Sequence, residues 1–307
     1  MQIQIDEQWL PVYEALASKV RLEMIRLLAE RPMNVKELAQ ALGLSSAIMT
    51  MHVKKLEKAG IIRNELVPSK GGVQKISRLN VDFIGISFPG KESGEREYHR
   101  TEVSVGHYTD FDIAPTCGLA TPKQIIGHFD DPRCFLDPER VDAKILWFGQ
   151  GYVEYKVPNY LLGNEIPEEL EISLEVSSEA PSVNHEWPSD ITFVLNGVSL
   201  GYWTSPGDFG GTKGRYTPSW WNLNINQYGL LKIIRVNQSG TFMDGEKMSD
   251  VTLEDLDIRR KYWTFRIAVP EDAANVGGAT LFGTGFGNYA QDIVFKLYYA
   301  KAAAPAD

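Results

Sequence analysis

The stretch that decides the fold runs from Glu37 to Ile62 and reads ELAQALGLSSAIMTMHVKKLEKAGII. Its apolar residues recur at helical spacing on both sides of Gly43, which predicts two helices joined by a tight turn. In the second helix Met49, Val53 and Leu56 lie at positions i, i+4 and i+7, so we expect them to form the stripe that faces a core. The other side of that helix is polar and basic.

The polar side of the second helix carries short or flexible side chains around a pair of lysines. Its residues are Ser45, Ser46, Ala47, Thr50, Met51, Lys54 and Lys55. Such a surface can enter the major groove of DNA without steric overlap, while the charges at its flanks contact phosphates. We therefore predict that these residues bind double-stranded DNA.

The sequence on both sides of this stretch completes a small domain. Upstream, residues 12–28 have helical apolar spacing, and Asn34 with Glu37 forms the pattern of a capping box. Downstream, IIRNELV and QKISRLNV predict the two strands of a hairpin, with Lys70 at its tip and Lys75 beside it. We expect both lysines to contact the DNA backbone.

The region from ALASKVRLEM to QKISRLN resembles the winged helix-turn-helix of the arsenical-resistance (ArsR) family of bacterial repressors. The helix order, the Leu-Gly-Leu-Ser turn and the Lys-Leu-x-x-Ala-Gly-Ile end of the second helix carry the resemblance. It implies a homodimeric repressor that pairs through its first helix and reads operator DNA with the helix from Ser45 to Ala59. Metal-sensing members have paired cysteines in the helix before the turn. Because VKELAQAL has neither Cys nor His, metal sensing is not implied here.

The charge of the chain is unevenly distributed. Residues 1–80 contain 12 Lys and Arg against 8 Asp and Glu, a net charge of +4, whereas the remainder contains 19 against 32, a net charge of −13. Only the N-terminal part therefore suits a polyanion. This local charge disfavours the alternative that the winged helix serves only contacts with other proteins.

Length and composition predict two globular domains. The chain has 307 residues, of which 43% are hydrophobic and 23% charged, which is ordinary for proteins that bury a core. No apolar run approaches the roughly 20 residues of a membrane helix, and the N-terminus lacks the pattern of a signal peptide. We expect a cytoplasmic protein without membrane contact. The two cysteines, Cys117 and Cys134, fit free thiols in a reducing compartment.

The sequence beyond residue 96 predicts β-structure almost throughout. Apolar or alternating runs recur between turn residues, among them AKILWFGQGYVEYKV, LEISLEVSS, GLLKIIRVNQ, KYWTFRIAV and QDIVFKLYYA, and Asn196-Gly197 is a two-residue hairpin signal. We therefore predict a multidomain α+β chain. Its parts are a winged helix-turn-helix at residues 1–88, a linker at 89–96, an antiparallel β-sandwich of jelly-roll type at 97–301 and a disordered tail at 302–307.

One long segment of the predicted sandwich, GYWTSPGDFGGTKGRYTPSWWNLNINQYG, is rich in aromatic and amide side chains. Aromatic rings stack on pyranose rings, while Asp, Asn and Arg side chains form hydrogen bonds with hydroxyl groups. We expect Trp220 and Trp221 to be adjacent in a strand, where they must point to opposite faces, so both cannot fill one core. By pattern alone the segment resembles the sandwiches of carbohydrate-binding modules. We predict that a sugar is bound by Trp203, Asp208, Arg215, Tyr216, Trp220, Trp221, Asn222 and Asn224.

A second group of side chains raises the question of a metal site. His99, His107, Cys117, His128 and Cys134 fall within 36 residues. They show no Cys-x-x-Cys or His-x-x-x-His spacing that would fix two ligands on one face, so structural packing is favoured. We predict no metal and no cofactor, and a metal- or thiol-responsive switch stays open as an alternative.

Enzymatic activity has little support in the sequence. Glu169, Glu171 and Glu175 could share one face of a strand, as carboxylates for glycoside hydrolysis would, but like-charged neighbours on a strand are typical of a solvated face. No Gly-x-Ser-x-Gly, phosphate loop, dinucleotide fingerprint or His-Glu-x-x-His motif occurs. We therefore predict a protein that is not an enzyme.

These observations predict a homodimeric transcriptional regulator, a repressor whose sandwich senses a sugar or oligosaccharide. Sugar binding would favour a dimer whose two recognition helices no longer match successive major grooves about 34 Å apart. The alternatives are a sandwich that serves only dimerisation or protein partners, and the metal- or thiol-responsive switch.

Overall fold

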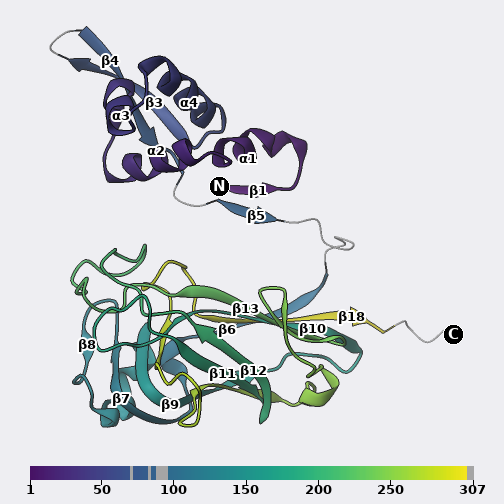
Figure 1. Ribbon diagram of the computed structural model, residues 1–307. Helices are drawn as coiled ribbons and strands as arrows, with labels where there is room; N and C mark the ends of the chain where they lie inside the picture. Colours follow the sequence, from purple (N-terminus) through teal and green to yellow (C-terminus); the bar gives the residue numbers. More distant parts are fainter. Residues whose placement is uncertain (70–71, 82–83, 88–95, 303–307) are drawn as a thin grey trace. The chain divides into compact units, whose positions relative to one another are not determined.

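The computed structural model describes residues 1–69, 72–81, 84–87 and 96–302. The chain divides into two compact units, residues 1–94 and residues 95–307. Both are shown in Figure 1. Residues 89–95 of the predicted linker and residues 303–307 of the predicted tail lie outside the described residues, so those boundaries stay predictions.

The first unit is helical with a small hairpin. Its elements are β1 (Gln2–Gln4), η1 (Glu7–Trp9), α1 (Leu10–Leu16), α2 (Lys19–Glu30), β2 (Met33–Asn34), α3 (Val35–Ala41), α4 (Ser46–Lys58), β3 (Ile62–Ser69), β4 (Gly72–Leu79) and β5 (Gly85–Ser87). The antiparallel hairpin of β3 and β4 takes β2 as its third strand, and β1 pairs in parallel with β5. The predicted helix-turn-helix with its wing is confirmed.

The local signals of the sequence act as expected in this unit. Glu37 N donates to Asn34 Oδ1 at 2.9 Å and Asn34 N donates to Glu37 Oε2 at 2.8 Å, so the capping box that begins α3 is complete. Gly43 has a φ of 63°, the left-handed conformation that favours glycine after a helix. The predicted stripe of α4 is buried with Met24 and Leu38 of the neighbouring helices.

The second unit is a β-structure with four short 3-10 helices. Its elements are β6 (Tyr98–Val103), η2 (Val105–His107), β7 (Asp110–Ala120), β8 (Ile125–Ile126), η3 (Pro132–Leu136), η4 (Pro138–Asp142), β9 (Ile145–Pro158), β10 (Glu165–Ser177), β11 (Ser189–Leu195), β12 (Val198–Ser205), β13 (Leu230–Asn237), β14 (Gly240–Met243), β15 (Glu246–Ser249), η5 (Glu254–Leu256), β16 (Tyr262–Val269), β17 (Ala279–Phe282) and β18 (Ile293–Lys301).

These strands form two layers (Figure 1), and the pairings of β17 connect them. One layer has the order β6-β18-β10-β13-β14-β15, and the other has the order β12-β11-β16-β9-β7-β8. The strand β17 pairs with the end of β10 on one side and with the beginning of β9 on the other. All pairings are antiparallel, which confirms the predicted sandwich.

The alternation of the sequence explains which side chains lie between the layers. In β16, Trp263, Phe265 and Ile267 are buried and their neighbours are more exposed. The predicted hairpin turn joins β11 to β12, and Asn196 and Gly197 have φ values of 52° and 85°, as a type I′ turn requires.

None of the helices in the described part of the chain is long and apolar enough to span a membrane.

Candidate nucleic-acid interface and ligand cavity

The exposed face of α4 contains every residue of that helix region that the sequence singled out for DNA. Ser45 begins the helix as its N-cap, with Oγ accepting a hydrogen bond from Ile48 N at 3.3 Å. The following residues are all exposed, whereas the stripe on the opposite side is buried: Ser46, Ala47, Thr50, Met51, Lys54 and Lys55. The helix therefore presents a surface of mostly short or flexible side chains, among which Ile48 and Met51 are exposed and apolar.

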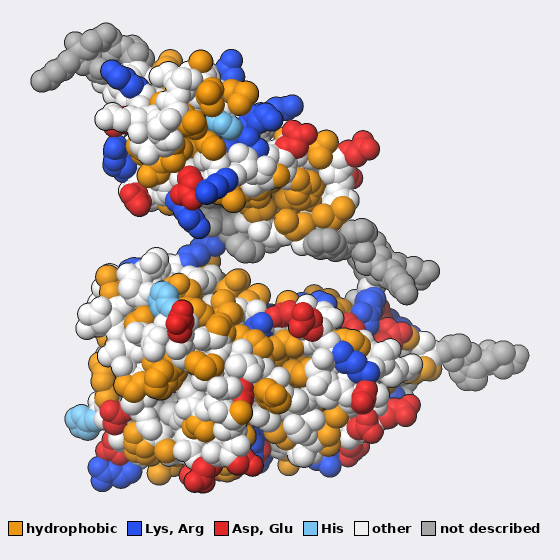
Figure 2. All heavy atoms as spheres, in the orientation of Figure 1, with side chains coloured by type: hydrophobic (Ala, Val, Ile, Leu, Met, Phe, Trp, Pro, Cys, Tyr) orange, Lys and Arg blue, Asp and Glu red, His pale blue; other side chains and the backbone are white. Residues whose placement is uncertain are grey.

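The charge at this surface comes from lysines near the end of α4. Lys54, Lys55 and Lys58 are exposed, and none forms an ion pair with a residue that the structure describes. Figure 2 shows further Lys and Arg side chains on the visible face of this unit. Part of the net positive charge of residues 1–80 thus lies on the exposed surface of α4, where it is accessible to phosphates.

Of the two lysines predicted for the wing, Lys75 belongs to the described residues and Lys70 lies outside them. Lys75 Nζ lies 3.2 Å from Glu57 Oε2, and hydrogen bonds from Asn64 and then from Lys75 lower the pKa of Glu57. The charge of Lys75 is therefore partly compensated within the protein, and its contact with DNA stays a prediction.

A buried arginine fixes the position of α4, a role that the sequence reasoning missed. Arg21 donates from Nε to the Ala15 carbonyl at 2.7 Å and from Nη2 to the Glu14 carbonyl at 2.6 Å. Its Nη1 lies 3.3 Å from His52 Nδ1 on α4. Burial, and then the charge of Arg21, lower the pKa of His52, which favours the neutral ring that can accept this hydrogen bond. One side chain thus joins the end of α1 to α4.

The structure does not bring the eight predicted sugar-binding residues into one pocket. Trp203, on β12, lines a groove of about 560 Å³. Asp208, in the loop after β12, lines a different cavity of about 300 Å³. In the groove, Lys232 Nζ lies 4.4 Å from the centre of the Trp203 ring and 2.5 Å from Asp244 Oδ2. One face of that ring is therefore already covered.

The expectation that Trp220 and Trp221 lie in a strand is wrong. Both lie in the loop between β12 and β13, where adjacent side chains need not point to opposite faces. Trp221 is 3% exposed and packs edge-on against Trp147 and Phe286, with ring centres 5.8 and 5.2 Å away. This aromatic cluster is buried, so Trp221 packs within the protein, and its contact with a sugar stays a prediction.

The other predicted residues of this loop are exposed and stand apart. Trp220 is 41% exposed, and its Nε1 donates to the Pro122 carbonyl at 2.7 Å. Asn222 Oδ1 accepts from Asn224 N at 2.9 Å, which is a turn within the loop. The Arg215 guanidinium lies 5.3 Å from the ring centre of Tyr216, and both side chains are exposed.

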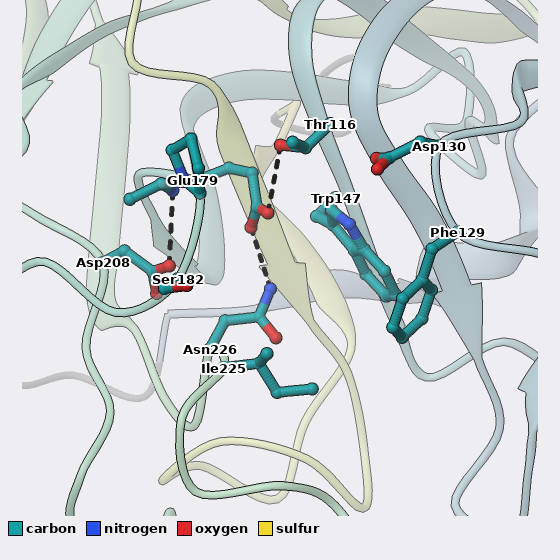
Figure 3. Close-up of a pocket in the computed structure, with 11 residues that line it drawn as sticks. Thr116, Phe129, Asp130, Trp147, Glu179, Ser182, Asp208, Ile225 and Asn226 are labelled. Atoms are coloured by element: carbon teal, nitrogen blue, oxygen red, sulfur yellow. Dashed lines mark hydrogen bonds between the residues drawn. The ribbon is translucent and has the colours of Figure 1, made fainter.

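The cavity beside Asp208 lies close to β17, because Thr280 of that strand pairs with Trp147 and donates a hydrogen bond to Glu179. Figure 3 shows its lining residues. Its walls come from β7, β9, the segment between β8 and η3, the segment after β10 and the loop between β12 and β13. The lining residues are Thr116, Phe129, Asp130, Trp147, Glu179, Ala180, Pro181, Ser182, Asp208, Ile225 and Asn226. Among them, only Asp208 was singled out from the sequence.

Two buried carboxyl groups dominate the chemistry of this cavity. Burial raises the pKa of Asp208 to about 7, although the backbone N–H of Ala180 opposes the shift. Burial, reinforced by the charge of Asp208, raises the pKa of Glu179 well above its usual range. Because each ionised carboxylate disfavours the other, the cavity holds protons at a pH where exposed carboxylic acids have lost them.

The aromatic wall of the cavity depends on a glycine. Trp147 and Gly118 are partners in the pairing of β9 with β7, and a Cβ at Gly118 would overlap the indole ring. The ring therefore lies across β7 and reaches Phe129, whose ring centre is 5.3 Å away and whose side chain is half exposed. The cavity thus combines two aromatic rings with hydrogen-bonding groups, a composition common in small-molecule sites.

The described histidines and cysteines of the sequence cluster have individual local contacts. His99 Nε2 lies 2.7 Å from Glu165 Oε2, and burial raises the pKa of Cys117 to about 12. Cys134 Sγ accepts from the backbone N–H of His128 at 3.3 Å, and His107 ends η2. No group of three or more His, Cys, Asp or Glu residues within the described ranges is placed to hold a metal ion.

The three glutamates of β10 are each held by different partners. Glu171 forms ion pairs with Arg235 at 2.9 Å and Lys296 at 3.0 Å. Glu169 pairs with Arg96, and Glu175 accepts hydrogen bonds from three backbone N–H groups while burial raises its pKa to about 7. The carboxylates are thus part of the framework of the sheet.

A family model and a curated protein both match the helix-turn-helix region of this chain. The model of a helix-turn-helix domain family matches residues 16–65. An uncharacterized HTH-type transcriptional regulator of Methanocaldococcus jannaschii is 37% identical over 54 residues, which are 18% of this chain and 57% of that protein. The chain thus spans little more than half the length of this curated relative. The predicted helix-turn-helix is confirmed by both matches.

Two solved structures are similar to the two units. An ArsR family transcriptional regulator is 26% identical, with a TM-score of 0.22, over 25% of this chain and 79% of its own. A carbohydrate-binding module, CBM36 in complex with calcium and xylotriose, is 11% identical, with a TM-score of 0.28, over 64% of this chain and 98% of its own.

Proposed function

We propose that this protein is a transcriptional regulator that binds operator DNA through α4 and responds to a small ligand bound by its sandwich. The observation that carries the proposal is the polar, lysine-flanked surface of α4 within a confirmed helix-turn-helix. Lysines at the edge of a groove-sized helix neutralise phosphates, and short side chains at its centre reach base edges. Binding to DNA is the activity that this surface suits best.

The proposed regulator acts as a homodimeric repressor. Two copies of α4 would occupy successive major grooves of a palindromic operator, about 34 Å apart. The acidic sandwich unit, with 30 Asp and Glu against 18 Lys and Arg in residues 95–307, would repel DNA and confine binding to the helical unit. A ligand that favours another arrangement of the dimer would then lower the affinity for the operator.

The proposed effector is a sugar or a short oligosaccharide, and the sandwich is a binding domain without catalytic activity. The 300 Å³ cavity is the best candidate for its site because it joins the rings of Trp147 and Phe129 to the polar groups of Thr116 and Asn226. Aromatic faces and amides are the groups that proteins use to bind sugar rings and hydroxyls.

The DNA-binding part of the proposal is tested by the salt dependence of affinity. An operator is first selected from a random DNA library with the full-length protein, and dissociation constants are then measured by fluorescence anisotropy from 50 to 300 mM salt. We expect Lys54→Ala to weaken binding across sequences and to reduce the slope of log affinity against log salt by about 1, because one phosphate contact is lost.

The matched control is Lys156→Ala, which removes the same charge from β9 of the sandwich. It should leave both the affinity and the slope unchanged. If the two variants behave alike, or if no DNA sequence is enriched, α4 is not the DNA-binding surface. Titration of sugars and oligosaccharides into the complex of protein and operator then tests the response, and we expect the right effector to release the DNA.

A further inference from the structure

The cavity beside Asp208 is unusual in its charge. Three of the residues that line it, Asp130, Glu179 and Asp208, carry carboxyl groups, and none of the described lining residues is a Lys or an Arg. In the same sandwich, Glu175 is held by backbone N–H groups, whereas Glu171 has Arg235 and Lys296 as its cations. Buried charges in proteins are usually paired in this way. The described lining of the cavity therefore offers these carboxyl groups no Lys or Arg, and the nearby positive charge is that of His185 beside Asp208.

Glu179 is surrounded by donors that carry no charge. It is 8% exposed. Its Oε1 accepts from Thr116 Oγ1 at 3.2 Å, and its Oε2 accepts from Asn226 Nδ2 at 2.9 Å and Thr280 Oγ1 at 2.8 Å. These contacts fix the orientation of the carboxyl group but leave its charge uncompensated.

Asp208 also lacks a Lys or Arg partner, although the Ala180 backbone, the charge of His185 and the Phe209 backbone favour its ionised form. It is 1% exposed, and its Oδ2 accepts from the backbone N–H of Ala180 at 3.3 Å. Its Oδ1 has no hydrogen-bond partner within the described residues, and neither does Oδ1 of Asn226, which is 3% exposed. Leaving a buried acceptor without a donor costs about 1–3 kcal/mol. Two such acceptors beside one cavity indicate a ligand that brings donors.

The remaining wall of the cavity also suits a cation. Figure 3 shows the rings of Trp147 and Phe129 on the right and the carboxyl groups of Glu179 and Asp208 on the left. The face of an aromatic ring attracts a cation through its quadrupole, and the indole ring does so most strongly. Aromatic rings together with carboxylates are the groups by which proteins hold organic ammonium ions.

We propose that this cavity binds a ligand with a protonated amino group, and that the effector is an amino sugar. The inference rests on the proposed function and names the chemical class of its effector. The ammonium group would approach Asp208 and Glu179, and the ring would face Trp147. The raised pKa values of both carboxyl groups support the assignment, because burial disfavours their charges and no Lys or Arg of the described lining compensates them.

A metal ion fits the same charges less well. Both oxygens of Glu179 already accept hydrogen bonds, and no group of three His, Cys, Asp or Glu residues in the described part of the chain is placed as a metal site. A divalent cation demands several oxygen ligands at fixed distances. An ammonium group requires only nearby carboxyl groups and ring faces.

The test is isothermal titration calorimetry of the full-length protein without DNA at pH 7, with four probes. Glucosamine carries the ammonium group and the ring, glucose lacks the amine, N-acetylglucosamine has a neutral amide in its place, and ethanolamine lacks the ring. We expect glucosamine to bind at least about tenfold more tightly than glucose and N-acetylglucosamine. Equal binding of the three sugars would overturn the proposal, as would a response to calcium chloride with none to glucosamine.

Variants locate the binding site. Asp130→Asn removes one negative charge with little risk to the fold, because Asn tolerates the φ of 60° and its Oδ1 can still accept from Cys117 N. We expect this change to weaken glucosamine binding several-fold, and Asp208→Asn to abolish the preference for glucosamine over glucose. Asp244→Asn, in the separate groove, is the matched control and should change nothing. A preference that survives Asp208→Asn in folded protein would contradict the assignment.

Two outcomes separate this inference from the proposed function. If glucosamine binds selectively and DNA affinity does not change, the ammonium site stands and the proposed effector response fails. If ethanolamine binds as tightly as glucosamine, the ammonium group is recognised without a ring. The ligand class is then confirmed as an organic amine, and the choice of an amino sugar is overturned.

Discussion

At the residue scale, Trp221 and its neighbour Trp220 should contribute very differently to stability. Trp221 is 3% exposed within the aromatic cluster, whereas Trp220 is 41% exposed and has one hydrogen bond to the Pro122 carbonyl. We expect Trp221→Ala to lower the free energy of unfolding by about 3–5 kcal/mol, because it leaves a cavity in a core. Trp220→Ala should cost about 1 kcal/mol. Urea unfolding followed by circular dichroism measures both, and equal losses would contradict the packing.

The buried carboxyl of Asp208 should make stability depend on pH. Its pKa is about 7 in the folded protein against an ordinary value of 3.8 when unfolded. Between these values the unfolded state loses the proton and the folded state keeps it, so the contribution to stability falls as the pH rises. Asp208→Asn removes this contribution. From pH 4.5 to pH 7.5 the stability of the variant should rise relative to the wild type by about 2–4 kcal/mol.

Urea unfolding at several pH values, without ligand, checks this expectation. Only the difference between the two proteins is interpreted, since other carboxyl groups such as Glu171 have lowered pKa values and act in the opposite direction. Parallel pH profiles of the variant and the wild type would show that Asp208 ionises normally in the folded protein.

Single residues of the cavity were hard to predict for a physical reason. Asp208 could be found because it lies in a polar, aromatic loop. Glu179, Thr116 and Trp147 belong to segments that are far apart in sequence and meet only where β17 closes the corner between the layers. Nothing in SSEAPS or ILWFGQG marks them as neighbours, because the pairing of distant strands has no local signal.

At the scale of elements, the capping box of α3 offers a measurable prediction. Asn34 Oδ1 accepts from Glu37 N, and Asn34 Nδ2 also donates to Gln74 Oε1 at 3.2 Å, which joins the helix to β4. We expect Asn34→Ala to destabilise the helical unit by about 1–2 kcal/mol, because an N-cap and a side-chain hydrogen bond are lost. Asn34→Asp keeps the cap and is the control. Thermal unfolding of both variants measures their stability. If Asn34→Ala is as stable as the wild type, the role of the cap is contradicted.

Elements with strong periodicity were predictable, and the exceptions have identifiable causes. The stripe of α4 and the alternation of β16 report burial directly, so the sequence pattern and the structure agree. The three-residue strands β1 and β5 are too short for a period, and they pair across more than 80 residues. Trp220 and Trp221 were misplaced because an apolar pair in a loop resembles the start of a strand.

At the scale of the whole molecule, DNA binding and ligand binding are assigned to different compact units. The N-terminal unit carries the net positive charge and the sandwich the net negative charge, so each half suits one class of ligand. Coupling between them is then a property of the full-length chain, because neither unit alone contains both sites. Separating the units should therefore preserve both binding activities and abolish the response of one to the other.

This separation can be made without breaking a described element. A cut after Gly94 keeps β5, whose pairing with β1 helps to cover Ile3, a residue that is 1% exposed. We expect residues 1–94 to bind the operator within about tenfold of the full-length affinity, since the phosphate and base contacts of α4 remain. The amino sugar should no longer change that affinity. Residues 95–307 should bind the amino sugar as the full-length protein does, since the whole cavity lies within them.

Anisotropy with labelled operator and calorimetry with glucosamine measure the two fragments side by side. A cut after Leu79 is the structural control, because it removes β5 and should destabilise the helical unit by uncovering Ile3. If residues 1–94 still respond to the amino sugar, the effector site lies in the helical unit and the assignment of the sandwich is wrong. If they bind no DNA although they fold, the surface of α4 depends on the sandwich, and regulation must act on the DNA-binding state itself.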